Sequence, residues 1–321
     1  MVSGMEEMLP DIAFGPVPSR RLGRSLGINN VPPKVCSYSC VYCQLGRTLK
    51  MSAERQEFYQ PQEILEAVKA KIRKAQDSDE RIDYLSFVPD GEPTLDVNLG
   101  REIELLRRLA IRIAVITNAS LISRGDVRDD LMMADWVSLK VDSTADDVWH
   151  RIDRPLGSLT LDTVLQGVHE FARAYDGQLV TETMLVRGLN DGPEQVEETA
   201  KFVSRLHPSV AYLSIATRPP AEGWVEPPSE EALTRAYQIM SQRLDSVQYL
   251  IGYEGDAFAA TGRAEEDLLS ITAVHPMRRD AVRTLLSRTG ADWSVVEELV
   301  EKGLLVETEY AGATFYVRRF N

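Results

Sequence analysis

The chain has 321 residues and a mass of 36.0 kDa, enough for one large domain or two smaller ones, and its 44% hydrophobic and 26% charged residues are ordinary for a globular protein. A net charge of -13 disfavours casual binding to nucleic acid. No run approaches the roughly 18 apolar residues that a membrane span needs. The first residues are acidic and lack the apolar core of a secretory signal, and an odd number of cysteines, 3, argues against a disulfide scaffold. We therefore expect a cytoplasmic protein that works in a reducing compartment, without a membrane partner.

From about residue 25 to residue 250, short β-like runs alternate with segments of helical periodicity. The β-like runs are rich in Val, Ile, Leu, Tyr and Thr, and most are bounded by polar residues or by Gly and Pro. The predicted strands are 25–30, 82–88, 112–118, 136–142, 178–186 and 210–216.

Apolar residues at three- and four-residue spacing mark the helices between these strands. Pro61 suits the opening position of the first helix, and Ser229 is the predicted N-cap of the last. The predicted helices cover 61–76, 99–110, 160–174, 193–206 and 230–243. This alternation predicts an α/β fold, a partial (β/α)6 TIM-like barrel of parallel strands joined by right-handed crossovers. In such folds the chemistry lies at the C-terminal ends of the strands.

The chain after residue 262 has a different pattern. Three helical segments, the last ended by Gly303, precede an alternating run with a Gly-containing turn, which predicts a hairpin. This order resembles a winged helix, so we divide the chain into a barrel domain, 1–260, and a small winged-helix-like C-terminal domain, 261–321. The third helix has a net charge of -3, from Asp292, Glu297, Glu298 and Glu301 against Lys302. That sign disfavours DNA binding and leaves a contact with a protein or substrate, or a structural role, as the expectation.

The only 3 cysteines lie close together in the run "PPKVCSYSCVYCQLGRT" as Cys36, Cys40 and Cys43. A structural zinc site needs a fourth ligand. The chain has four histidines to offer, none of them near in sequence: His150, His169, His207 and His275. A [4Fe–4S] cluster also usually takes four thiolates, and with three of them one iron keeps an open position for a small molecule. The C-x3-C-x2-C spacing lets one loop reach three corners of such a cluster.

The run Cys36-Ser-Tyr-Ser-Cys40-Val-Tyr-Cys43, after the first strand of a (β/α)6-like pattern, resembles the signature of the radical S-adenosylmethionine (radical SAM) superfamily. Tyr42 occupies the place of an aromatic residue that is typical there. The resemblance implies an enzyme in which the three cysteines hold a [4Fe–4S] cluster and the open iron binds S-adenosylmethionine. Reductive cleavage would give methionine and a 5′-deoxyadenosyl radical that abstracts hydrogen from a substrate.

Further motifs follow the predicted strands where this superfamily would place them. The run "DGEPT" resembles the Gly-Gly-Glu element that holds the methionine amino group. Gly91 and Glu92 match this element, whereas Asp90 replaces its first glycine. A plain Asp-Gly turn is the structural alternative.

Three more polar residues at strand ends are candidate cofactor contacts. Asn118 suits a hydrogen bond to the ribose or the carboxylate, and Asp142, less clearly with Lys140, suits the superfamily's polar contact to the ribose. Glu182 lies inside the fifth strand, where a buried acid needs a partner, so a cofactor or substrate contact is predicted. For Asn118, Asp142 and Glu182 a structural hydrogen bond is the open alternative.

The chain from Gly15 to Ala53 holds six basic residues and no acidic one, a local charge of +6. This stretch suits an anionic electron donor such as flavodoxin or ferredoxin; solvated charges that offset an anionic metal site are the alternative. Arginines in later loops suit the grip of an anionic substrate, or salt bridges within the loops: Arg151, Arg154 and Arg218.

The runs "FGPVPSRRLGRSLGINN" and "DGEPTL" resemble one branch more closely, single-cluster Fe–S oxidoreductases near the wyosine-type tRNA-modifying synthases. The substrate expected is a small molecule, a peptide or a modified nucleoside; tRNA stays open but is disfavoured by the acidic charge. The rival hypothesis is a metal- or redox-responsive regulator that senses through the cysteine loop and binds a partner through the C-terminal domain. A zinc-stabilised barrel with acid–base chemistry is a third.

Overall fold

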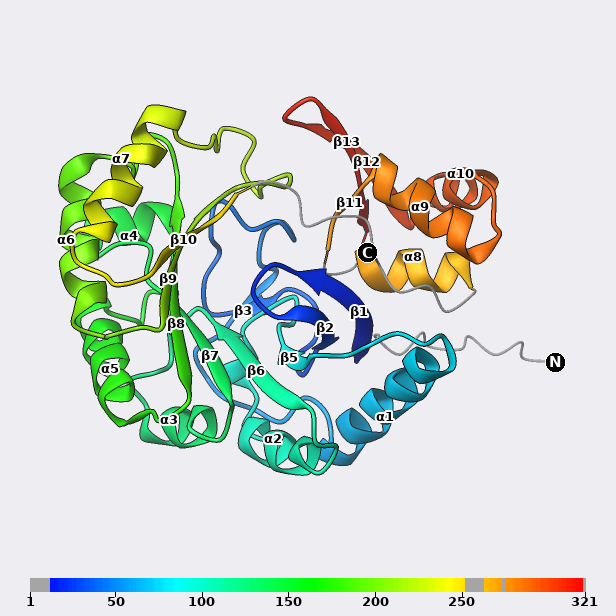
Figure 1. The fold of residues 1–321 in the computed structure, drawn as a ribbon, viewed down its shortest axis with the longest axis horizontal. Helices are drawn as coiled ribbons and strands as arrows, with labels where there is room; N and C mark the ends of the chain where they lie inside the picture. The colour runs from blue at the N-terminus through cyan, green and yellow to red at the C-terminus, as the bar shows by residue number, and fades with distance from the viewer. Residues whose placement is uncertain (1–11, 252–262, 273–274, 320–321) are drawn as a thin grey trace.

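The computed structural model describes residues 12–251, 263–272 and 275–319 (Figure 1). A single sheet of 8 strands, in the order β1-β2-β5-β6-β7-β8-β9-β10, curls around one side of the molecule. The edge strand β1 is antiparallel to β2, and every later neighbour pairs in parallel. The strands are β1 (Ala13–Ser19), β2 (Gly23–Ile28), β5 (Tyr84–Phe87), β6 (Arg112–Thr117), β7 (Trp136–Lys140), β8 (Gln178–Leu185), β9 (Val210–Ile215) and β10 (Val247–Leu250). The predicted partial barrel is confirmed.

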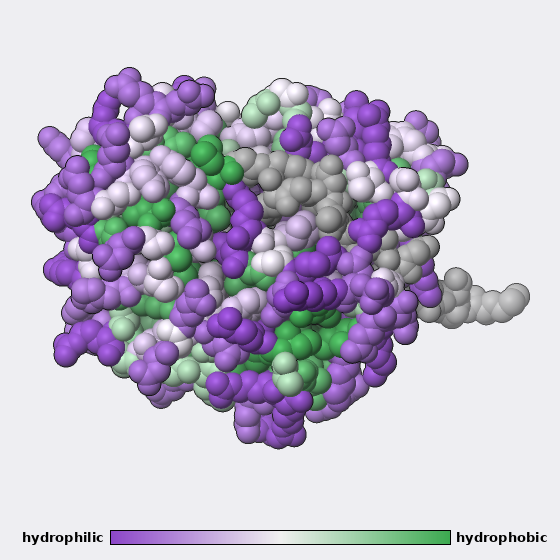
Figure 2. All heavy atoms as spheres, viewed as in Figure 1, coloured by the Kyte–Doolittle hydropathy of each residue, from purple (hydrophilic) through white to green (hydrophobic). Residues whose placement is uncertain are grey.

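Helices cover the outer, convex face of the sheet (Figure 1). They are α1 (Pro61–Asp77), α2 (Leu99–Arg107), α3 (Gly125–Leu131), α4 (Asp146–Ile152), α5 (Leu161–Ala174), α6 (Pro193–Ser204) and α7 (Glu230–Ser241), with a 3₁₀ turn, η1 (Pro93–Leu95), after β5. Ser229 caps α7 as predicted, because its hydroxyl accepts a hydrogen bond from the Ala232 N–H at 3.1 Å. Each of the longer helices buries the residues of one side, such as Ile64, Leu65 and Val68 of α1, and Figure 2 shows hydrophilic residues over much of the rim where the helices lie. The helices are therefore amphipathic, with their apolar faces against the sheet.

The hydrophobic core lies between the sheet and these helices. Leu26, Leu85, Ile113 and Val137, from four neighbouring strands, are all fully buried. Such residues alternate along each strand with side chains that point to the concave face, where the polar motifs begin. The face of the sheet that the helices cover thus forms the hydrophobic core, and the concave face carries the polar motifs.

All six predicted strands are present, and the elements of this region that were missed include β1, β10, α3 and α4. β1 contains Pro16 and Pro18, which argue against a strand unless it lies at an edge, where β1 does lie. β10 has only 4 residues, and α3 and α4 have 7 each, so none carries enough apolar repeats to stand out.

The C-terminal unit contains the predicted three helices and hairpin. Its elements are α8 (Ala264–Thr272), β11 (Met277–Arg278), α9 (Arg279–Thr289), α10 (Ser294–Glu301), β12 (Leu305–Tyr310) and β13 (Ala313–Arg318), with a sheet ordered β11-β13-β12. Gly303, with a φ of 69°, ends the third helix as predicted. The core of this unit also takes in Phe14 and Val17 of β1, so the unit packs on the edge of the barrel sheet. The predicted boundary near residue 260 lies outside the described residues, and the division into two domains and the winged-helix interpretation stay predictions.

Within the described part of the chain, no helix combines the length and the apolar character that crossing a bilayer requires.

Candidate active site

The three cysteines lie on one irregular loop at the C-terminal end of β2. Two short parallel strands, β3 (Val35–Cys36) and β4 (Lys50–Met51), close the base of this loop. Within it, the Cys43 N–H donates to the Cys40 carbonyl at 3.1 Å, and the Gly46 N–H donates to the Cys43 carbonyl at 3.0 Å. These successive turns bring Cys36, Cys40 and Cys43 to the wall of one cavity of about 290 Å³.

The cavity lies on the concave side of the barrel, where the strands end. Besides the cysteines, predicted residues that line it are Tyr42, Gly91, Glu92, Asn118 and Glu182. Asp142 does not line it, and neither do the four histidines that the zinc alternative would need. Residues predicted from separate strand ends are therefore brought together, with Asp142 as the exception.

All three thiols have pKa values raised by burial, and at Cys43 nearby cations partly offset this rise. Burial raises the pKa of Cys36 to about 12 and raises the pKa values of Cys40 and Cys43. At Cys43 the cations Lys34 and Lys140 act in the opposite direction and favour the thiolate. Among the described residues, no three His, Cys, Asp or Glu side chains converge on a point that could hold one metal ion. An iron–sulfur cluster does not need three side chains that converge on one point, because each cysteine binds a separate iron.

The Gly-Gly-Glu-like run lines the cavity next to the strand that carries Cys36. Gly91 pairs with Val35 so closely that a Cβ on Gly91 would lie 2.1 Å from the Val35 carbonyl oxygen. The Asp90 carboxylate pairs with Lys34 Nζ at 3.2 Å, and burial raises its pKa to about 6. The end of β5 is thus joined directly to the strand that carries Cys36.

Glu92 is buried, and its carboxylate is held by donors from two strand ends. Oε1 accepts from the Thr94 N–H at 3.1 Å and from the hydroxyls of Thr94 and Thr117 at 2.6 Å each. Oε2 accepts from the Asn118 N–H at 2.8 Å. Glu92 therefore fixes the ends of β5 and β6 relative to each other.

Asn118 contacts the first cysteine. Its Nδ2 donates to Ser37 Oγ at 3.0 Å and lies 3.5 Å from Cys36 Sγ, while its Oδ1 accepts from the Ser120 N–H at 2.9 Å. An amide N–H beside a sulfur favours negative charge on that sulfur. The Asn118 side chain thus makes structural hydrogen bonds within the chain, and its contact with a cofactor stays a prediction.

Tyr42 connects the cysteine loop to two buried carboxyls. Its hydroxyl donates to Asp142 and lies 3.1 Å from Asp153 Oδ1, which also accepts from Cys40 Sγ at 3.4 Å. Burial raises the pKa values of both aspartates. Asp142 lies behind Tyr42, and its Oδ1 accepts from the Met184 N–H at 2.7 Å. Asp153 was not predicted, because nothing in the run "HRIDRP" links it to the cysteine loop more than 100 positions earlier.

Glu182 of β8 shares its carboxylate between two cations. It forms an ion pair with Arg21, lies 3.5 Å from Lys140 Nζ, and accepts from Ser214 Oγ at 3.0 Å. Burial alone would raise the pKa of Glu182, but Lys140 and Arg21 hold it at about 2. The predicted partner of this strand acid is thus a pair of cations on the cavity wall.

The basic stretch from residue 15 to 53 is largely neutralised by acids distant in sequence. At least four of its six cations form ion pairs: Arg21 with Glu182, Arg24 with Glu80, Lys34 with Asp90 and Arg47 with Glu222. Of the three later arginines, Arg218 lines the cavity, Arg154 pairs with Glu222, and Arg151 is exposed away from the lining. The cations of this stretch therefore do not form a continuous surface of unpaired positive charge.

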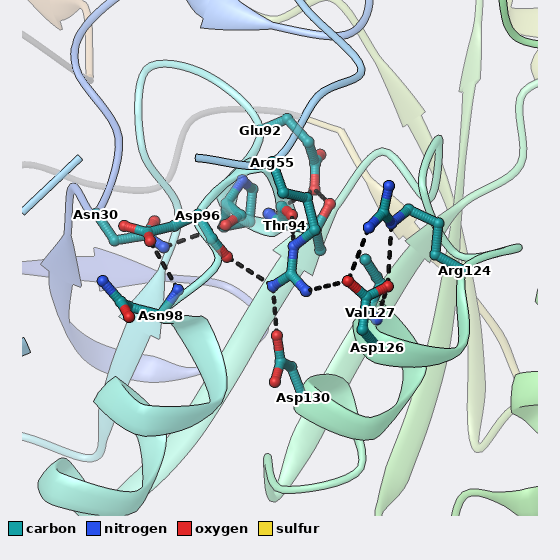
Figure 3. A network of polar contacts seen from close by, with 11 residues as sticks. Asn30, Arg55, Glu92, Thr94, Asp96, Asn98, Arg124, Asp126, Val127 and Asp130 are labelled. Carbon is teal, nitrogen blue, oxygen red and sulfur yellow. Dashed lines mark hydrogen bonds and ion pairs between the residues drawn. The ribbon is translucent and has the colours of Figure 1, made fainter. Parts of the chain in front are cut away.

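A polar network supports the Glu92 turn from behind (Figure 3). Arg55, whose side chain is 4% exposed, donates to the Thr94 carbonyl at 3.0 Å and to the Asp96 carbonyl at 2.6 Å. The same guanidinium pairs with Asp126 at 3.0 Å and with Asp130, both on α3. Figure 3 shows Arg55 between the η1 turn and this helix. One arginine thus ties the segment after Glu92 to the outer layer.

A buried glutamate at the edge of this network makes stability dependent on pH. Glu102 of α2 is fully buried, and burial together with the charge of Asp96 raises its pKa to about 9. An unfolded glutamate has a pKa of about 4.3. The folded chain therefore binds more protons between these two values, and stability falls as the pH rises through that window.

We expect Glu102→Gln to flatten this decline, which amounts to at most about 1.4 kcal/mol per pH unit for one proton. The measurement is the free energy of unfolding in urea at about pH 6 and about pH 8. Glu104→Gln changes an exposed glutamate on the same helix and should leave the pH dependence as it is. Equal slopes for the wild type and Glu102→Gln would contradict the expectation.

The chain is similar to several known proteins. The sequence model of the Radical SAM superfamily matches residues 30–203, more than half of the chain. The chain is 45% identical to a UPF0026 protein of Methanocaldococcus jannaschii, over 96% of each. It is 31% identical to a protein named GTPase Obg from Brachyspira hyodysenteriae, over 92% of this chain, which spans 42% of that relative.

Among solved structures, a radical SAM methyltransferase from Sphaerobacter thermophilus matches with a TM-score of 0.57 and 18% identity, over 71% of this chain and 67% of that one. This likeness shows a shared fold. The family match covers all three cysteines of the cavity together with Gly91 and Glu92. The resemblance predicted from the cysteine motif is therefore confirmed, and the chain is an enzyme that belongs to the radical SAM superfamily.

Proposed function

We propose that Cys36, Cys40 and Cys43 hold a [4Fe–4S] cluster and that the enzyme cleaves S-adenosylmethionine reductively in the reducing cytoplasm. The observation that carries the proposal is the meeting of three cysteines and the Gly91–Glu92 element in one cavity. When bound, the cluster supplies one electron that splits the sulfonium, giving methionine and a 5′-deoxyadenosyl radical that takes a hydrogen atom from the substrate.

The residues of the chain fit such a group. Three thiolates on one loop leave a ligand position open, and Lys34 and Lys140 favour the charged form of Cys43. Asn118 would orient Cys36 through its amide, and Tyr42, whose hydroxyl donates to Asp142, would hold the segment that follows Cys40. These contacts would fix the loop around Cys36 and Cys40 at the cavity wall.

We assign the remaining predicted residues by their places. Gly91 and Glu92 form the wall on which the methionine amino group would lie, and Gly91 permits the close approach of Val35. Glu182, with Lys140 and Arg21, presents a charged group at the cavity for the cofactor or the substrate. Asp142 acts through Tyr42 and does not itself face the cavity.

The proposed partners are an acidic one-electron donor of the flavodoxin or ferredoxin type and a small molecule, peptide or nucleoside substrate. The net charge of -13 disfavours DNA and tRNA. The family membership supports an enzyme and gives no support to the regulator hypothesis.

The test is anaerobic. Protein rebuilt with iron and sulfide, reduced with dithionite and given S-adenosylmethionine should form 5′-deoxyadenosine, detected by mass spectrometry. Samples without reductant provide the control. A protein that binds no cluster, or that leaves S-adenosylmethionine intact when loaded and reduced, would overturn the proposal.

A further inference from the structure

The loop after β9 carries a buried glutamate that joins two other loops. Glu222 is 7% exposed and lies between β9 and α7. Arg47 Nε and Nη2 lie 2.9 Å from its two carboxylate oxygens, and Arg154 Nη1 lies 2.6 Å from Oε1. Hydrogen bonds from Arg47 and Arg154 hold the pKa of Glu222 below its usual range. The Glu222 carboxylate thus forms a bidentate pair with Arg47 and accepts one more hydrogen bond from Arg154.

Both arginines belong to segments that contact the cysteines. Arg47 is in the cysteine loop itself, four positions after Cys43. Arg154 follows Asp153, the residue that accepts hydrogen bonds from Cys40 Sγ and the Tyr42 hydroxyl. Arg154 has a φ of 47°, in the left-handed region, which a non-glycine residue keeps only where its surroundings hold it. Glu222 is one of the contacts that hold it.

The backbone and an apolar neighbour add to this link. The Glu222 N–H donates to the carbonyl of Val41, between Cys40 and Cys43, at 3.1 Å. Val225, three positions on, is buried in one cluster with Val41 and Tyr42. The β9–α7 loop therefore packs against the Cys40–Cys43 segment through backbone, charge and apolar contacts.

We infer that Glu222 is a positioning residue for the cysteine loop, holding Arg47 and Arg154 so that the three sulfurs stay at the cavity wall. The inference rests on the proposed function, because it concerns the loop conformation in which the three sulfurs bind iron. Glu222 itself does not line the cavity, so it acts through the loops that it joins. Without its charge, Arg47, with a side chain that is 69% exposed, is free to turn into solvent.

The test compares Glu222→Gln with Glu226→Gln in the iron–sulfur-loaded protein. Glu226 lies on the same loop and pairs with Arg187 in an exposed ion pair, so it is a matched control. Glu222→Gln should speed iron loss to a chelator about ten-fold. It should also speed amide hydrogen exchange in residues 41–48, while Glu226→Gln matches the wild type in both.

Equal iron loss and equal exchange for the two variants would overturn the inference. If Glu222→Gln does not fold, Arg47→Gln takes its place, because it removes the exposed partner and keeps the Glu222–Arg154 pair. A wild type that binds no iron and sulfide would refute the proposed function instead. Hydrogen exchange on that cluster-free protein would then decide the role of Glu222 by the same comparison.

Discussion

Replacing Cys43 with serine is expected to abolish cluster binding and to lower S-adenosylmethionine cleavage by more than about 100-fold. A serine hydroxyl stays protonated where a thiol can ionise, and Lys34 and Lys140 favour the charged form at this position. The turn itself should survive, because the backbone groups of Cys43 bond to Cys40 and Gly46 independently of the side chain. The readouts are iron content, cluster absorbance and 5′-deoxyadenosine formed without air.

Ser39→Ala is the matched control, since it changes the same loop by one hydroxyl and removes no cysteine. It should load iron and form 5′-deoxyadenosine at close to the wild-type level. A Cys43→Ser protein with full iron content and unchanged cleavage would exclude Cys43 as a ligand. A protein that keeps its cluster but loses cleavage would give Cys43 a role in catalysis other than binding iron.

The barrel could be predicted from sequence because its signal is local. Each of the six predicted strands and each long helix carries its own run of apolar residues, so the alternation was visible without knowledge of any contact. β1 was missed because its two prolines mark a non-strand unless the edge position is known. That strand is also where the C-terminal unit packs, through Phe14 and Val17. Because β1 was not predicted, the packing of the C-terminal unit on the barrel could not be predicted either.

The site was predictable where one residue type carries the chemistry. Three cysteines at a fixed spacing indicate iron–sulfur binding; Gly91–Glu92 and Asn118 follow strands whose ends converge, and Glu182 lies inside a neighbouring strand. Asp142 was placed at the same edge by this rule, but the structure directs its carboxylate to Tyr42 and the Met184 amide. A strand-end position thus predicts which side of the barrel a residue occupies, and it does not predict which partner it binds.

The ion pairs that sequence reasoning missed join residues that are far apart along the chain. Glu222 and Arg47 are 175 positions apart, and Glu182 and Arg21 are 161 apart. A count of local charge therefore assigned +6 to a stretch whose arginines mostly face carboxylates. Charge compensation between loops depends on the fold, and it became visible only with the structure.

The second large effect is expected at Glu182, where Glu182→Gln leaves Arg21 and Lys140 beside a neutral amide. Removing one partner from a buried ion pair typically lowers the free energy of unfolding by about 3–5 kcal/mol. Because Lys140 and Arg21 line the cavity, the variant should also bind S-adenosylmethionine or substrate more weakly. Urea unfolding and a titration with S-adenosylmethionine, monitored by the spectrum of the reduced cluster, measure the two effects.

The pH dependence gives an independent signature of the same group. The pKa of Glu182 is held at about 2, below the value of about 4.3 for an unfolded glutamate, so its stabilisation is complete above the higher value. It is lost as the pH falls through this interval, and Glu182→Gln should lack that part of acid destabilisation. Glu197 is the matched control, since it also faces two cations, Arg243 and Lys201, but at the surface. Surface pairs contribute little, so Glu197→Gln should keep the wild-type stability and acid profile, and an equal loss in both variants would refute the special position of Glu182.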